Sequence, residues 1–264
     1  MRHRAPLAMV GCVFAGASMI ATAASSGEPS TAPVYRYAVD HVRLHDPSSF
    51  TEGLAYRDGY LIESAGLPGR SSLRRVVIRT GRVVRRADLP DAFWAEGATV
   101  LGARVYQLTY QEETGFVYDA RTFRQVRAFH YTGEGWGLTD DGNRLIMSDG
   151  SDTLTFRDPE TFAVRKQLEV HDGGARITGL NELEFVRGAV CANVYTTPRI
   201  ACIDAKSGEV RYWIDLTGLL PPRLSADGAS DANGIAYDAR RNRLFVTGKF
   251  WPRLYQIHRI RPAP

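Results

Sequence analysis

The stretch EGATVLGARVYQLT, residues 96–109, has the pattern of a β-hairpin that opens on a carboxylate. A polar residue and a glycine precede a short apolar run, a turn follows at Gly102, and a second apolar run completes the unit. Four other stretches share the pattern of a polar or aromatic residue, usually a glycine, and then two apolar runs separated by a turn: EGLAYRDGYLIES from Glu52, WGLTDDGNRLIMS from Trp136, NELEFVRGAVCANV from Asn181 and NGIAYDARRNRLFVTG from Asn233. The five starts lie 44, 40, 45 and 52 residues apart, a period typical of propeller blades.

A second pair of strands is expected between successive hairpins, as in RRVVIRTGRVVRRADL, FVYDARTFRQVRAF, LTFRDPETFAVRKQL and IACIDAKSGEVRYWI. The last repeat has only RLYQIHRI after its hairpin, while VYRYAVDHVRL, residues 34–44, has no repeat of its own. We therefore expect this N-terminal strand to join the last blade and close the ring, which protects the terminal edges. The sequence predicts an all-β protein, a single five-bladed β-propeller over residues 34–261, with its longest insertion at residues 217–232.

The composition indicates a globular chain with a core and no strong charge bias. Of its 264 residues, 44% are hydrophobic, and the formal net charge is +4 with no block of like charge. Binding to nucleic acid or to a membrane surface is therefore not indicated. The first 24 residues, with a basic start, an apolar stretch and ATAA, have the features of a signal peptide, so we expect a periplasmic or secreted protein. A lipoprotein site at Cys12 is the alternative.

Two cysteines, Cys191 and Cys202, remain once the signal peptide is removed. Both lie in VCANVYTTPRIACI, which has the pattern of a hairpin that turns near Pro198. A cross-strand disulfide is plausible in an exported protein, and two separate buried thiols are the alternative.

The repeat-start residues should converge at one mouth of the central channel, because the first strand of each blade runs beside the axis. Convergent polar groups within an apolar wall are the usual description of a ligand site. The expected ring comprises Phe50, Glu52, Glu63, Ser64, Trp94, Glu96, Thr109, Tyr110, Trp136, Ser148, Asp149, Asn181, Asn193, Tyr195, Asn233, Thr247 and Lys249. No histidine shares this phase, so neither a histidine-based triad nor a zinc site is supported.

Each of these residues also has a structural interpretation. The aromatic residues could pack between blades, and the asparagines and Asp149 could form turns. Glu52 could accept hydrogen bonds from inner strands, and Lys249 could be solvated or paired with Glu52. Glu96 follows Trp94 closely and is either a solvated loop carboxylate or a carboxylate in an apolar site with a raised pKa, suited to proton transfer.

Motifs along nearly the whole chain resemble one family, the plant and bacterial glutaminyl-peptide cyclotransferases. The motifs are, in order, FTEGLAY, ESAGLPGRSSL, EGATVLGARVYQLTY, GEGWGLT, MSDGSDTL, LNELEFV, NVY, NGIAYD and VTGKFWPRLYQI, and the resemblance extends from about Tyr35 to Ile257. The resemblance implies a five-bladed propeller that converts the N-terminal glutamine of a peptide into pyroglutamate and releases ammonia. It implies no catalytic metal and no cofactor, and its partners are peptides or proteins with N-terminal glutamine. We expect a monomer.

The resemblance also assigns roles to residues. The proton-shuttling Glu falls on Glu96, and the lysine of the TGKxWP motif on Lys249. The substrate-binding positions fall on Phe50, Glu52, Trp94, Tyr110, Trp136, Asn181 and Tyr195. Four positions depart from the plant pattern: Glu52 replaces Gln, Trp94 replaces Phe, and Tyr110 and Tyr195 replace Trp.

Two questions stay open at this level. Either Lys249 or the Asn181 amide could stabilise the oxyanion that cyclisation creates. Two other classes of function also fit a propeller: a calcium-dependent lactonase or esterase using Glu52, Asn181 and Asn233 as oxygen ligands, and a ligand-binding module without catalysis.

Overall fold

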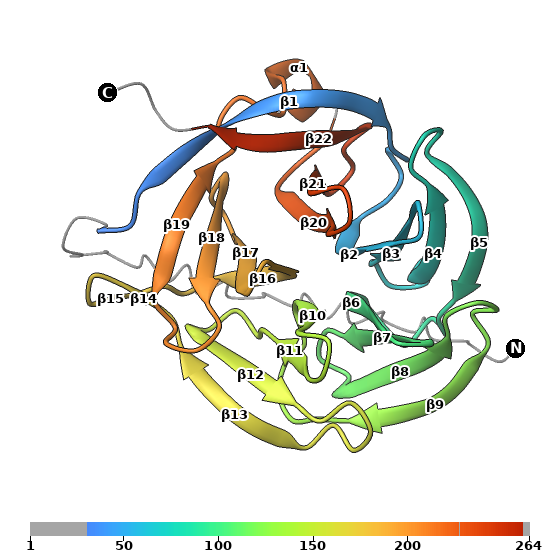
Figure 1. The fold of residues 1–264 in the computed structure, drawn as a ribbon. Helices are drawn as coiled ribbons and strands as arrows, with labels where there is room; N and C mark the ends of the chain where they lie inside the picture. Colours follow the sequence, from blue (N-terminus) through green and yellow to red (C-terminus); the bar gives the residue numbers. More distant parts are fainter. Residues whose placement is uncertain (1–30, 227, 261–264) are drawn as a thin grey trace, which may run out of the picture.

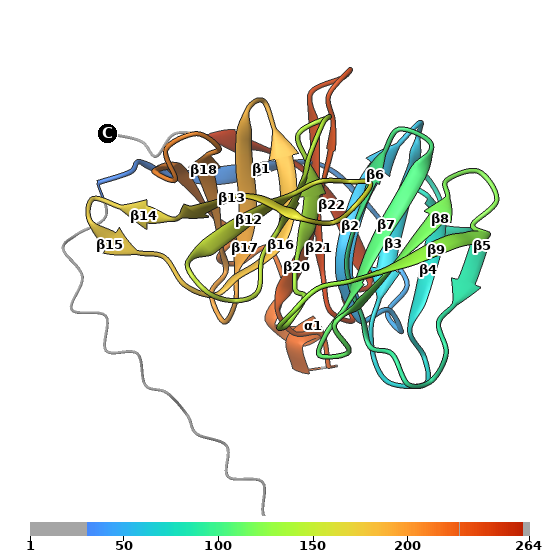
Figure 2. The same ribbon diagram turned by 90° about the horizontal axis from the view of Figure 1, so that it is seen from below.

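The computed structural model describes residues 31–226 and 228–260. Its mainly antiparallel sheets are arranged as a ring around a central axis, with the strands β2, β6, β10, β16 and β20 beside the axis and the later strands of each set further out (Figure 1). Turned by 90°, the ring is a single layer of sheets, with the short helix α1 on one face (Figure 2). The all-β class expected from the sequence is confirmed, and the arrangement is propeller-like.

Three four-stranded sheets follow one another in the first part of the chain. The first contains β2 (Thr51–Arg57), β3 (Tyr60–Ala65), β4 (Ser72–Val77) and β5 (Arg82–Asp88). The second contains β6 (Ala95–Leu101), β7 (Arg104–Thr109), β8 (Thr114–Asp119) and β9 (Gln125–His130). The third contains β10 (Leu138–Asp140), β11 (Leu145–Met147), β12 (Thr153–Arg157) and β13 (Val164–Glu169). In each sheet the strands pair in chain order, so each is a meander of hairpins.

The remaining long strands form one eight-stranded sheet in the order β16-β17-β18-β19-β1-β22-β21-β20. Its members are β16 (Leu180–Val186), β17 (Ala189–Val194), β18 (Arg199–Asp204), β19 (Val210–Asp215), β20 (Ala232–Asp238), β21 (Arg243–Gly248), β22 (Arg253–Ile260) and β1 (Val34–Leu44). The N-terminal strand β1 pairs antiparallel with β22, as the sequence analysis expected. It also pairs in parallel with β19 at two positions, Val34 with Trp213 and Tyr35 with Ile214, which joins two sets of four strands into one sheet.

The insertion at residues 217–232 contains the helix α1 (Pro222–Ala226), which the strand pattern did not predict. A two-stranded sheet of β14 (His171–Asp172) and β15 (Ala175–Arg176) precedes β16. Among the described residues, no helix is both long and apolar enough to cross a membrane. The expected signal peptide and Cys12 lie outside the described residues.

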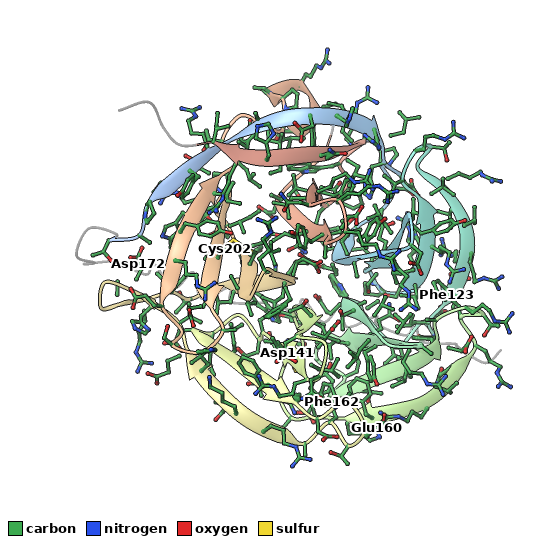
Figure 3. All side chains as sticks on the ribbon, viewed as in Figure 1. Phe123, Asp141, Glu160, Phe162, Asp172 and Cys202 are labelled. Carbon is green, nitrogen blue, oxygen red and sulfur yellow. A yellow bond between two sulfur atoms is a disulfide. The ribbon has the colours of Figure 1, made fainter. Side chains whose placement is uncertain are left out.

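Apolar side chains fill the spaces between adjacent sheets (Figure 3). Phe162, labelled in Figure 3, occupies the β12–β13 turn and stacks on Phe129 of β9, with ring centroids 3.9 Å apart. This contact joins the second sheet to the third. Each sheet therefore buries apolar surface mainly against its neighbours, as expected for a repeat architecture.

Close approach of the inner strands explains the glycine that follows the first residue in each of the first three repeats. A Cβ added at Gly53 would lie 2.4 Å from the amide nitrogen of Ala98, and one at Gly97 would lie 2.4 Å from that of Leu138. A Cβ at Gly137 would meet the carbonyl oxygen of Asn181 at 2.0 Å. Any larger residue would push the inner strands apart, so the glycines fix the tight packing around the axis.

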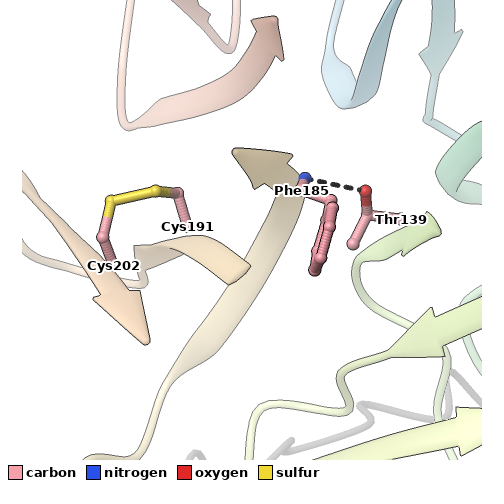
Figure 4. Close-up of a disulfide and its surroundings, with 4 residues drawn as sticks. All are labelled: Thr139, Phe185, Cys191 and Cys202. Atoms are coloured by element: carbon pink, nitrogen blue, oxygen red, sulfur yellow. Dashed lines mark hydrogen bonds between the residues drawn. A yellow bond between two sulfur atoms is a disulfide. The ribbon is translucent and has the colours of Figure 1, made fainter. Parts of the chain in front are cut away.

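The fourth repeat has Glu182 where these glycines stand, and its carboxylate bonds to backbone of two other inner strands. It accepts hydrogen bonds from the amides of Leu54 and Ile235, at 3.0 and 2.8 Å. A hydrogen bond from the Phe185 amide to Thr139 Oγ1 likewise joins β16 to β10 (Figure 4). The inner strands are thus linked by side chains as well as by packing.

Cys191 and Cys202 form a disulfide between directly paired residues of β17 and β18 (Figure 4). Both side chains are buried, and the bond between them supports the cross-strand bridge over two separate buried thiols. The bridge closes a short loop, with a sequence separation of 11.

Replacing both cysteines by alanine is expected to destabilise the fold by about 3 kcal/mol, because the unfolded chain regains the freedom that the loop constrains. At this chain length that loss lowers Tm by about 6–12 °C, measurable by calorimetry. An unchanged Tm would contradict a stabilising role for the bridge.

Candidate active site

The start of the inner strands surrounds a cavity of about 240 Å³. It is lined by all nine residues that the sequence analysis assigned to catalysis or substrate binding: Phe50, Glu52, Trp94, Glu96, Tyr110, Trp136, Asn181, Tyr195 and Lys249. They come from five different hairpins and the segments beside them. The ring therefore brings together side chains that are up to two hundred residues apart in the chain.

Glu96, at the second position of β6, is the buried carboxylate of this cavity, with 6% of its surface exposed. No hydrogen bond from any other described residue reaches its carboxylate. Burial, together with the nearby charge of Glu52, raises the pKa of Glu96 well above that of an exposed carboxyl. The solvated-loop interpretation of Glu96 is therefore wrong, and its free oxygens are available to a ligand.

Glu52 is also buried, but it is fully engaged. Its carboxylate lies 2.9 Å from Lys249 Nζ and accepts a hydrogen bond of 2.9 Å from Asn233 Nδ2. The Lys249 ammonium in turn lies over the ring of Phe50, 4.4 Å from its centroid. Burial, only partly offset by the charge of Lys249, raises the pKa of Glu52 to about 7.

Aromatic rings form the wall of the cavity. Trp94 contacts Phe50 and Tyr110 edge-on, with centroids 6.1 and 5.9 Å apart. Trp136 contacts Tyr195 edge-on at 5.7 Å. The aromatic residues thus surround the ligand space rather than packing only between sheets, and Tyr195, 44% exposed, marks its outer rim.

Asn181 contributes a free amide to the cavity. Its side chain is buried, and the Oδ1 atom has no hydrogen-bond partner among the described residues. A buried amide without a partner is costly, so this group is suited to bind a polar atom of a ligand.

Eight residues of the predicted ring do not line the cavity but form hydrogen bonds to cavity residues or to other residues. Asn233 holds Glu52, Ser148 Oγ bonds the Asn181 carbonyl, and the Asn193 Oδ1 atom accepts from the Gly234 amide. The others with a partner elsewhere are Glu63, Ser64, Thr109, Thr247 and Asp149. Asp149 bonds the backbone and hydroxyl of Ser151, which is the turn-forming role that was its alternative.

Two residues beside the cavity were not predicted. Glu134 accepts a hydrogen bond of 2.9 Å from the indole nitrogen of Trp136 and so fixes that ring. Phe250 has a left-handed backbone, with φ of 60°, and contacts the Phe50 ring at 5.1 Å. The sequence signal that could have identified them is their position close to Trp136 and Lys249, because loop residues near a site residue often hold its side chain in place.

The fold and the cavity define a class: a propeller-like β protein whose axial pocket holds a buried, unpartnered carboxylate among aromatic rings. The family model for glutamine cyclotransferase matches residues 11–259. The chain belongs to the glutamine cyclotransferase family.

Individual relatives agree with this assignment. A curated protein of Arabidopsis thaliana, glutaminyl-peptide cyclotransferase, is 43% identical over 217 residues, which cover 81% of this chain and 68% of that protein. The crystal structure of Myxococcus xanthus glutaminyl cyclase superposes with a TM-score of 0.81 at 30% identity, covering 88% of this chain and all of that one. The chain is accordingly an enzyme, of the transferase class.

Replacing Glu52 by Gln is expected to move the acidic limb of the kcat–pH profile to lower pH. The Glu52 charge raises the pKa of Glu96, so its removal lowers that pKa, and Glu96 then ionises at a lower pH. The profile of Glu209→Gln, a change at a partly exposed carboxyl outside the cavity, serves as the control. A limb that stays in place or moves to higher pH would contradict the coupling of the two carboxyls.

Proposed function

We propose that this chain converts the N-terminal glutamine of peptides or proteins into pyroglutamate, with Glu96 as the group that transfers the proton. The cyclotransferase reaction is that of its family, and the assignment of residues to steps is supported by one observation above the others. Glu96 is a buried carboxyl with no partner in the described structure, facing a cavity with aromatic walls.

Cyclisation is an intramolecular attack of the α-amine on the γ-carbonyl carbon of the same glutamine. A C–N bond forms, the bond to the amide nitrogen breaks, and ammonia leaves. Because the ring has five members, the reactive atoms are already close, and the enzyme mainly selects the folded-back conformation. The attacking amine must lose a proton and the departing nitrogen must gain one.

A single carboxyl group can perform both transfers. In its ionised form Glu96 accepts a proton from the attacking amine, and it then donates that proton to the departing nitrogen. A raised pKa suits this role, since the group must be able to hold the proton near neutral pH and also release it.

The remaining groups that line the cavity have different roles toward the substrate. Lys249 is held by Glu52 and the Phe50 ring, so its main effect is to set the charge of this half of the cavity. The Asn181 side chain makes no hydrogen bond to another described residue, so its Nδ2 group can donate to the γ-carbonyl oxygen and the developing oxyanion while Oδ1 accepts from a substrate N–H. This favours Asn181 over Lys249 as the oxyanion contact. The aromatic wall encloses the glutamine side chain and limits access of water, which would otherwise hydrolyse the amide.

The function is tested by incubating the purified protein with a Gln-Ala peptide and, in parallel, with the same peptide acetylated at its N-terminus. Mass spectrometry should show loss of one ammonia from the free peptide and no change in the acetylated one, whose nitrogen cannot attack. An unchanged free peptide would refute the proposed activity.

The calcium-dependent hydrolase is less well supported by the donor set. Two of its three expected ligands, Glu52 and Asn233, bond to one another, and the Lys249 ammonium occupies the cation position beside Glu52. No cluster of three or more His, Cys, Asp or Glu side chains suited to a metal occurs within residues 31–226 and 228–260. Activity that is lost with a chelator and restored by calcium would favour this alternative.

We also propose the finer architecture and the location of the protein. The eight-stranded sheet divides at the β1–β19 edge into two sets of four strands, which with the other three sheets gives five blades. The disulfide supports export to the periplasm or medium, where such bonds persist. A monomer acting on peptide substrates, without nucleic acid or membrane, is the simplest form of this proposal.

A further inference from the structure

A buried histidine–glutamate pair lies beside the active site and has no part in the chemistry described above. His45 Nε2 is 2.9 Å from Glu63 Oε1, and His45 Nδ1 is 2.6 Å from the carbonyl oxygen of Trp251. His45 is 6% exposed and Glu63 is fully buried. Pairs of this kind are retained in a core only where their partners are well arranged.

The partners of this pair determine its charge. A carbonyl oxygen can only accept, so His45 Nδ1 carries a proton. The same Glu63 oxygen accepts hydrogen bonds from Ser49 Oγ and Thr51 Oγ1, at 2.7 and 2.9 Å, which indicates a carboxylate. Nε2 must then also carry a proton, and His45 is a buried imidazolium.

The surrounding charges agree with this protonation state. Burial alone would lower the pKa of His45, but the Glu63 carboxylate outweighs it and the pKa is raised. Burial would raise the pKa of Glu63, but the His45 charge and then that of Arg74 lower it to about 2. Asp46 also raises the pKa of His45, and its carboxylate is itself paired with Arg74 at 3.0 Å.

The pair connects the two loops that supply one half of the cavity. Ser49 and Thr51 flank Phe50 and precede Glu52, whereas Trp251 follows Lys249 and Phe250. The backbone adds two links between the loops: the His45 amide donates to the Pro252 carbonyl, and the Phe250 amide donates to the Ser49 carbonyl. His45 and Glu63 thus hold the Phe50–Glu52 side of the cavity against the Lys249 side.

We propose that His45 and Glu63 are positioning residues for cyclisation. Their ion pair sets the distance between the loop that carries Phe50 and Glu52 and the loop that carries Lys249. The inference rests on the proposed role of these three residues in holding the substrate. Because the folded-state pKa of His45 is raised, its stabilising contribution is complete below the ordinary histidine pKa and is lost as the pH rises through the folded-state value. The cavity should therefore loosen as the pH rises through the folded-state pKa of His45.

The charge state is tested first on the wild-type protein, by NMR of protein carrying ¹⁵N-labelled histidine. At neutral pH both ring nitrogens of His45 should be protonated. The His45→Asn variant identifies the His45 signals. A neutral His45 ring at pH 7 would overturn the ion pair, and this measurement does not depend on any turnover.

The positioning role is tested by kinetics of His45→Asn, which keeps a donor for Trp251 but is too short and uncharged to pair with Glu63. We expect KM for the Gln-Ala peptide to rise on the order of 10- to 100-fold, with a smaller change in kcat. A merely destabilised fold would lower the apparent kcat through loss of active enzyme and leave KM unchanged.

The matched control is His171→Asn, which removes a partly exposed histidine–glutamate contact, that of His171 with Glu209, and should leave both constants unchanged. KM of His45→Asn within about twofold of the wild type would overturn the positioning role, since even small misplacement of binding groups is costly. If wild-type turnover with a Gln-initiated peptide is itself absent, the proposed function fails, and the NMR result still decides whether the ion pair exists.

Discussion

The Glu96→Gln variant is expected to lose ammonia release from a Gln-Ala peptide by a factor on the order of 10²–10⁴ in kcat. Glutamine has nearly the same shape but cannot accept a proton from the amine or donate one to the leaving nitrogen. Its Tm should not fall, because no described residue bonds to the Glu96 carboxylate and a neutral side chain is easier to bury. Steady-state kinetics and a thermal melt measure the two effects.

A second buried carboxyl provides the matched control for this variant. Glu184 of β16 lines a separate cavity of about 260 Å³ with Asp140 and Thr99, toward the other end of the inner strands. Burial also raises its pKa well above the ordinary value, so glutamine replaces a neutral acid there as well. We expect Glu184→Gln to keep normal turnover. Near-normal kcat in Glu96→Gln would exclude the proton-transfer role.

The Lys249→Met variant is expected to lower kcat/KM about 100-fold, because it leaves Glu52 buried without its cation. It should also move the acidic limb of the kcat–pH profile to higher pH. The Lys249 charge lowers the pKa of Glu96, so its loss raises that pKa, the opposite of the effect expected for Glu52→Gln.

The double variant Glu52→Gln, Lys249→Met distinguishes two roles of Lys249: balancing the charge of Glu52 and donating a hydrogen bond to the oxyanion. If Lys249 acts mainly by balancing Glu52, the double variant should recover part of the activity that Lys249→Met loses, and the two changes should be far from additive. If Lys249 instead donates directly to the oxyanion, the double variant should be at least as impaired as the single one. That outcome would contradict the assignment of the oxyanion to Asn181.

Much of the site could be predicted from the sequence because it follows from the repeat. The starts of the first strands converge in any propeller, so residues in the same phase as Glu96, such as Trp136 and Asn181, were expected at one mouth, and they line one cavity. The glycines after Glu52 and Glu96 are part of the same signal, since close packing of inner strands excludes a Cβ there.

What could not be predicted depends on contacts between distant segments. The pairing of Lys249 with Glu52 was one of two open possibilities, and only the three-dimensional arrangement decides between them. His45 lies outside the repeat phase, and its partner Glu63 is an ordinary second-strand residue, so no periodic pattern connects them. The parallel contact of β1 with β19 likewise depends on the curvature of the ring, not on strand propensity.

The most direct test of the account is the reaction of the wild-type protein with a Gln-Ala peptide in oxygen-18-labelled water, followed by mass spectrometry of the product. Attack by the peptide's own amine predicts a product that lacks one ammonia and contains no labelled oxygen. A product in which glutamate carries the label would show attack by water, and an unreacted peptide would show no attack at all; either result would contradict cyclisation in this cavity.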